Sequence, residues 1–127
     1  MKLRIVLSLV ASLLIGTAVG QEGKVTPLLS KELSPGKEGL VVTVDYPPGY
    51  SDPAHRHNAH VFAYVVEGSV VMQVKGGKQM VLTPGQTFYE GPGDVHVVSR
   101  NASNSKPAKF VVFFVKDKSA PVLVPMK

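Results

Sequence analysis

After residue 20, short apolar runs rich in β-branched residues alternate with clusters of glycine and proline. This pattern predicts strands at residues 25–30, 40–46, 61–67, 69–75, 78–82, 88–89, 95–99 and 110–115. No window in this part of the chain keeps an apolar period of 3.6 residues, so no helix is predicted. The predicted fold class is all-β, as a sandwich or a small barrel.

Several residues refine the predicted strands. Pro27 lies within the first run, and proline in a strand indicates a sheet edge. The Gly76-Gly77 pair predicts a tight hairpin. The unbroken apolar run at 110–115 favours a strand that is buried on both faces. The tail at 119–127 alternates valine and leucine with prolines and is expected to add an edge strand, in the same chain or in a neighbouring one.

The N-terminus has the features of an export signal. Lys2 and Arg4 precede an apolar run at 5–19, and Ala18-Val19-Gly20 has the small-x-small pattern of a cleavage site. The run is shorter than the roughly 20 apolar residues that a spanning helix needs. We therefore expect a signal peptide at 1–20, a mature single domain at 21–127, a periplasmic or secreted location and no stable membrane anchor after cleavage.

Charge and cysteine content narrow the remaining classes. Without residues 1–20 the chain has 12 basic and 9 acidic residues, a net charge of +3, and the basic residues are scattered. This balance gives no indication of nucleic-acid binding. The chain has no cysteine, so stability has to come from core burial, a bound metal or a partner subunit.

The histidines carry the candidate chemistry. His55, His57 and His60 lie within six residues of one another, and His96 follows far downstream. Because side chains on a strand alternate with period two, His55 and His57 are expected on the same face. Neutral imidazole is a ligand for several divalent metals. The pattern predicts a metal held by two local imidazoles and a distant one.

Two glycine-framed histidine motifs make the sequence resemble the cupin superfamily, specifically its small single-domain barrels. The first motif contains Gly49, His55, His57 and Gly68, and the second contains Gly85, Gly93 and His96, with Asn101 one residue beyond its usual position. The resemblance covers residues 40–115. It implies a double-stranded β-helix (jelly-roll) barrel with a metal near one mouth, and a homodimer, which the edge strands of a β sandwich also favour.

The departure from the family pattern that bears on the metal is at position 61. Val61 stands where the first motif has glutamate, and His60 precedes it. On a regular strand His60 faces away from His55 and His57, whereas a bulge would turn it inward. Some family members use a histidine in place of the glutamate. The candidate ligands are therefore His55, His57, His60 and His96, for iron, manganese, zinc or nickel.

Other polar and aromatic residues have simpler interpretations. Glu90 and Asp94 flank a turn and are expected to be solvated, and Arg56 is expected to point away from the metal. A second set is expected mainly to fill the barrel core, although it could also line a substrate pocket: Phe62, Tyr64, Met72, Phe88 and Phe113.

Three functions remain open. The first is an exported cupin that acts on a small molecule through its metal, as a dioxygenase-like oxygenase or an isomerase. The second is a small-ligand-binding module without turnover, which the loss of the motif glutamate at Val61 favours. The third is an assembly role in which the tail pairs between subunits.

Overall fold

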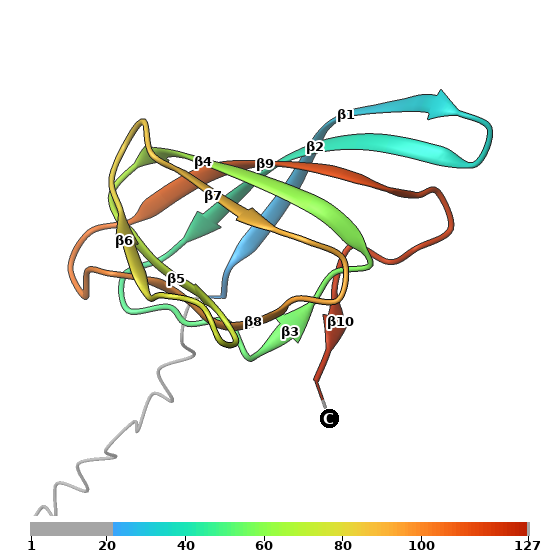
Figure 1. The fold of residues 1–127 in the computed structure, drawn as a ribbon. Coiled ribbons are helices and arrows are strands. Elements are labelled where there is room, and N and C mark those ends of the chain that lie inside the picture. Colours follow the sequence, from blue (N-terminus) through green and yellow to red (C-terminus); the bar gives the residue numbers. More distant parts are fainter. Residues whose placement is uncertain (1–21, 127) are drawn as a thin grey trace, which may run out of the picture.

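A computed structural model describes residues 22–126, which form ten strands in two five-stranded sheets (Figure 1). The strands are β1 (Lys24–Ser34), β2 (Lys37–Tyr46), β3 (His55–Arg56), β4 (Ala59–Glu67), β5 (Val70–Val74), β6 (Met80–Leu82), β7 (Thr87–Glu90), β8 (Val95–Asn101), β9 (Ala108–Asp117) and β10 (Val124–Pro125). The all-β prediction is confirmed. The predicted signal peptide at 1–20 lies outside the described residues.

All the strand pairs are antiparallel, and many join strands that are far apart in the sequence. The first sheet has the order β1-β2-β9-β4-β7, and the second has the order β10-β3-β8-β5-β6. The late strand β9 therefore lies between β2 and β4, and β8 lies between β3 and β5. This interleaving of early and late strands over two facing sheets gives the jelly-roll barrel that the resemblance implied. Within residues 22–126, no helix has the length and apolar character to span a membrane.

The core lies between the two sheets and follows the alternation of the strands. On β2, Leu40, Val42 and Val44 are buried, and on β9 the even-numbered positions from 108 to 116 are buried. The expectation that 110–115 is buried on both faces is wrong, because Phe113 is 36% exposed. The first sheet leaves its outer face uncovered, so an apolar run there need not be buried on both sides.

The β1–β2 hairpin forms one edge of the first sheet, as Pro27 predicted. β1 has a bulge between Pro27 and Leu29, and none of its residues is buried. The hairpin turns at Pro35-Gly36, where Gly36 has φ of 75°, a conformation that glycine adopts without steric cost. Figure 1 shows β1 along the outside of the sheet, with its turn end projecting from the barrel.

The tail returns to the barrel instead of leaving it. After β9, the Lys116 ammonium group donates to the carbonyl oxygens of Asp117 (3.2 Å) and Ala120 (2.8 Å). The chain then pairs with the second sheet, where β10 lies antiparallel to β3. The expected edge strand therefore forms within the same chain.

Candidate metal centre

Sheet pairing brings three of the four histidines together inside the barrel. His55 on β3 lies directly opposite His96 on β8, with ring centroids 5.0 Å apart. His57 follows β3, and its ring centroid is 4.9 Å from that of His55. All three side chains are buried. The predicted convergence of imidazoles from two separated segments is present in the structure.

Glu90 completes this group, although it was expected to be solvated. Its side chain is only 4% exposed, so that expectation is wrong. Its carboxylate oxygens lie 3.1 Å from His96 Nδ1 and 3.8 Å from His57 Nε2. The reason lies in the pairing of β7 with β4, where Glu90 stands directly opposite Val61 on the inner face. A carboxylate is therefore present opposite Val61, on the neighbouring strand.

A local signal for Glu90 does exist in the sequence. Phe88, Tyr89 and Glu90 alternate along β7, with Phe88 packed against the core, Tyr89 exposed and Glu90 buried. An inward Phe88 implies an inward Glu90, because side chains two residues apart share a face. The sequence does not show which strand lies next to β7.

The structure does not bring His60 to the group. It is exposed on the outer face of β4, and its Nδ1 lies 2.7 Å from the Tyr89 hydroxyl. β4 pairs in regular register from Ala59 to Val65, so no bulge turns this side chain inward. His60 therefore faces away from His55 and His57, as strand alternation predicts.

Backbone carbonyls orient two of the imidazoles. His55 Nδ1 lies 2.8 Å from the Pro53 carbonyl oxygen, and His57 Nδ1 bonds to the Val122 carbonyl oxygen. A carbonyl only accepts, so each Nδ1 has to carry the proton and each Nε2 keeps a free lone pair. Burial lowers the pKa of His57, although the Val122 carbonyl and the Glu90 charge oppose this effect. A neutral imidazole is the form that binds metal.

The group fits a divalent metal ion. One ligand atom from each of His55, His57, Glu90 and His96 can be chosen so that all four lie within 4.8 Å of one another. Glu90 Oε1 and His96 Nδ1 are buried 3.1 Å apart, but their contact does not have hydrogen-bond geometry. His96 Nε2 is buried without any hydrogen-bond partner, which normally costs about 1–3 kcal/mol. Three imidazoles and one carboxylate suit iron, manganese, zinc or nickel. A bound metal would satisfy atoms that the protein itself leaves unpaired.

A small, mainly apolar cavity of about 110 Å³ adjoins the group. Its walls include Val42, Val112, Phe114 and Met72. The cavity also contacts Tyr46, whose hydroxyl hydrogen-bonds to Asp52 and to Ser99 Oγ, the latter at 2.7 Å.

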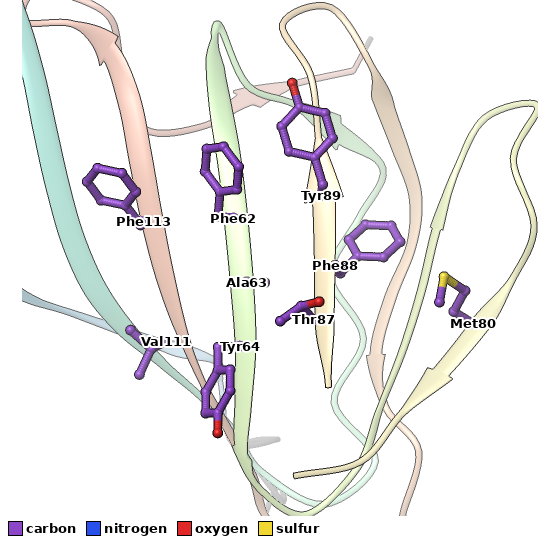
Figure 2. Close-up of a pocket in the computed structure, with 9 residues that line it drawn as sticks. All are labelled: Phe62, Ala63, Tyr64, Met80, Thr87, Phe88, Tyr89, Val111 and Phe113. Atoms are coloured by element: carbon purple, nitrogen blue, oxygen red, sulfur yellow. The ribbon is translucent and has the colours of Figure 1, made fainter. Parts of the chain in front are cut away.

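A second, open hollow of about 580 Å³ lies on the outer face of the first sheet (Figure 2). Phe113, Phe62 and Tyr89 follow one another across β9, β4 and β7, with Phe62 ring centroids 6.1 and 5.1 Å from those of the other two. Tyr64 lies on the same face, 51% exposed. The expected core role is wrong for Phe62, Tyr64 and Phe113. It is confirmed for Met72, which is buried.

The fold and the buried group together define a double-stranded β-helix barrel with an internal cluster that could bind a metal. Sequence comparison agrees with this description. The cupin domain family matches residues 42–114, and the chain belongs to this family. No curated protein matches the chain.

Solved structures with similar folds share little sequence with the chain. An uncharacterized conserved protein with a double-stranded β-helix domain from Klebsiella pneumoniae is 21% identical, with a TM-score of 0.65 over 87% of this chain and 90% of that one. The DMSP lyase DddQ from Ruegeria pomeroyi is 22% identical, with a TM-score of 0.62 over 69% of this chain and 43% of that one. The chain thus spans less than half of the length of this lyase. The polyketide cyclase RemF from Streptomyces resistomycificus is 21% identical, with a TM-score of 0.55 over 70% and 61% of the two chains.

Proposed function

We propose that this cupin binds one divalent metal ion through His55, His57, Glu90 and His96 and acts on a small molecule in the adjoining cavity. The observation that carries the proposal is the set of buried ligand atoms within 4.8 Å of one another, of which Glu90 Oε1 and His96 Nε2 make no hydrogen bond within the described residues. Such atoms are rare in folded proteins unless they serve a ligand or an ion.

The residues of the chain would supply the metal ligands and form the walls of the cavity. When bound, a divalent metal supplies a Lewis acid for a carbonyl or enol oxygen, and iron in addition supplies oxygen chemistry. His55 and His57 present Nε2, and Glu90 contributes negative charge. The volume of the cavity, 110 Å³, is below the roughly 150 Å³ of an engineered cavity that holds benzene. An oxygenase or isomerase acting on a molecule of a few carbon atoms fits this space.

Elemental analysis of the purified protein and three variants tests the metal centre. We expect about one metal ion per chain in the unaltered protein and in His60→Ala, because His60 lies on the outer face. His57→Ala and Glu90→Gln each remove a ligand from the buried group and are expected to lower the metal content severalfold. Equal metal content in all four proteins, or none in any of them, would contradict the proposal.

A second candidate is a small-ligand-binding module without turnover. It is favoured because the acidic groups of the cavity are already engaged. Asp52 accepts hydrogen bonds from Tyr46 and Tyr50, and Glu90 lies against His57 and His96. A general base would produce a pH-dependent rate. A binding module would show only a ligand-dependent rise in melting temperature.

We infer further that two copies associate through the outer face of the first sheet. Phe62, Tyr64, Tyr89 and Phe113 are 36–51% exposed, which leaves on the order of 350 Å² of apolar surface uncovered. Gly39 has no side chain, and the side chains of Phe113 and Leu33 both lie over it. Leu33 therefore extends this patch onto β1. The largest apolar patch on a monomer is typically about 300–600 Å² and is often functional. We propose a second copy of the chain as the partner, because a twofold axis brings the same patch of two copies face to face.

Sedimentation velocity over a range of concentrations tests this interface. The unaltered chain is expected to sediment as a dimer and Phe62→Lys as a monomer, because a charge at the centre of the patch would have to be desolvated. Val81→Lys is the matched control, since Val81 is 61% exposed on β6 of the second sheet. A monomeric unaltered chain, or a dimer in all three proteins, would overturn the inference.

We also propose that the protein is exported with loss of residues 1–20. The support is the basic start, the apolar run and the small residues at Ala18 and Gly20. Mass spectrometry of protein from the periplasmic and secreted fractions is expected to find a chain that begins at Gln21. A chain of full length in the cytoplasmic fraction alone would contradict export.

A further inference from the structure

We propose that the C-terminal strap, residues 118–126, is a positioning element of the candidate metal centre. The carbonyl of Val122 holds His57 in the tautomer that presents Nε2 to the other ligands. The proposal rests on the metal site for its functional meaning, but the contact itself is a property of the chain without metal.

The strap is fixed at both ends, so its middle has a defined position. At its start the Lys118 amide donates to the Gly36 carbonyl at 2.9 Å, and Lys116 Nζ holds the carbonyl of Ala120 at 2.8 Å. At its end β10 pairs with β3, and the Met126 amide donates to the Ala54 carbonyl at 3.3 Å.

Between these anchors the strap passes over the cavity. Val122 and Leu123 are both part of the cavity lining, and Val122 packs against the buried core. The strap therefore places one backbone carbonyl against His57 and two side chains over the space where a ligand would bind.

The two imidazoles of the His-x-His pair depend on different parts of the chain. His55 bonds to the carbonyl of Pro53, two residues away, so its orientation is local. His57 bonds to a carbonyl 65 residues away. Groups that orient metal-binding imidazoles in this way usually change metal affinity by about 10–100-fold when they are lost. Orientation of His57 is thus the contribution of the strap to the site.

The tautomer of His57 in metal-free protein tests the contact directly. Long-range ¹H–¹⁵N NMR of the imidazole rings is expected to show a single tautomer with the proton on Nδ1 in the unaltered chain and in Met126→Ala, which alters an exposed side chain of the strap and keeps the Val122 carbonyl. Deletion of residues 122–127 removes the acceptor, and a mixture of both tautomers is expected. A truncated, folded chain that keeps one Nδ1-protonated tautomer would overturn the proposal.

A second variant serves if the truncated chain fails to fold. Replacing the amide between Val122 and Leu123 by an ester, through semisynthesis, weakens the carbonyl as an acceptor and leaves every side chain in place. Leu123 donates no backbone hydrogen bond outside the strands in the described part of the chain, so the lost N–H is no confounding change. The ester chain is expected to populate both tautomers, and a single unchanged tautomer would contradict the proposal.

Competition of each chain with a chelating dye for Zn²⁺ gives the functional readout. We expect the truncated and ester chains to bind Zn²⁺ about 10–100-fold more weakly than Met126→Ala and the unaltered chain. Equal Zn²⁺ affinity in all four chains would refute the positioning role. Failure of the unaltered chain to bind Zn²⁺ would contradict the proposed metal centre instead, and the tautomer measurement would then still decide whether the strap orients His57.

Discussion

At the scale of single residues, Asn101 shows how one buried amide fixes the turns around the second motif. Its two Nδ2 N–H groups are shared among the carbonyls of Tyr46 (3.2 Å), Pro47 (3.1 Å) and Lys106 (2.8 Å), and its Oδ1 accepts from the Ser103 amide at 2.9 Å. The side chain is only 3% exposed. Asn101 thereby ties the end of β2 to the loop before β9, and its role is structural.

Asn101→Asp is expected to destabilise the protein by about 3 kcal/mol. The substitution keeps the shape and the acceptor, but it removes the donor and leaves a carboxylate facing three carbonyl oxygens. Urea unfolding measures the change. Asn104→Asp, an exposed position in the same loop, is the control and is expected to shift stability by less than about 0.5 kcal/mol. Similar losses in both variants would show that the amide contacts are not the cause.

The residues of the site differ in how far they could be predicted. His55, His57 and His96 are framed by glycines at characteristic spacings, so the sequence alone indicated that they meet. Glu90 has no such frame, because its place in the group depends on the pairing of β7 with β4 opposite Val61. Cross-strand neighbours are set by tertiary structure and leave no mark on local spacing.

At the scale of elements, Glu38 joins three strands of the first sheet. On β2, its carboxylate accepts from the Ser30 hydroxyl on β1 and pairs with Lys116 Nζ of β9 at 3.0 Å. The hydrogen bond from Ser30, followed by that from Lys116, lowers the pKa of Glu38 below its usual value of 4.5. The folded state therefore favours the charged carboxylate more than the unfolded state does.

This pKa shift predicts a pH dependence of stability. Because the pKa of Glu38 is lower in the folded state, its contribution is present above about pH 4.5 and is lost as the pH falls through the lowered pKa. Glu38→Gln is expected to flatten the fall in melting temperature between pH 6 and pH 3. Scanning calorimetry of this variant beside Glu67→Gln, at an exposed strand end, measures the difference. Parallel curves for all three proteins would contradict the prediction.

The elements were predictable where the pattern is local. Most strand positions and the edge position of β1 follow from alternation and from proline chemistry. The chain does turn at Gly76-Gly77, but the predicted tight hairpin is wrong, because β5 and β6 pair only as far as Met72 opposite Met80 and a longer loop joins them. The exposed row of Phe62, Tyr64 and Phe113 did not follow, since an apolar residue on a strand faces either the core or an uncovered sheet face. Only the layer arrangement decides between the two.

At the scale of the whole molecule, the candidate metal centre lies between the two layers of the barrel. Glu90 comes from the first sheet, whereas His55 and His96 come from the second. Unfolding separates these ligands, so metal binding and folding are expected to be coupled. The order of strands that produces this convergence is nonlocal, and only the resemblance to a known barrel suggested it from the sequence.

Zn²⁺ at about 100 times its dissociation constant is therefore expected to stabilise the folded state by roughly 2.7 kcal/mol. For a domain of this size, that corresponds to a rise in melting temperature on the order of 10 °C. Thermal scans with Zn²⁺ and then with excess EDTA measure the effect. Glu90→Gln is expected to lose most of the rise and His60→Ala to keep it. A rise of equal size in both variants would show that Zn²⁺ acts elsewhere.

The position of Glu90 opposite two imidazoles of the other sheet has a further consequence for a chain without cysteine. A disulfide limits the freedom of the unfolded chain by closing a covalent loop between distant residues. A metal ion bound by both sheets would cross-link the chain as a disulfide does, but reversibly. While bound, it would close loops between the segments near residues 55, 90 and 96. The rigidity of this barrel would then follow the supply of metal around it instead of the redox state.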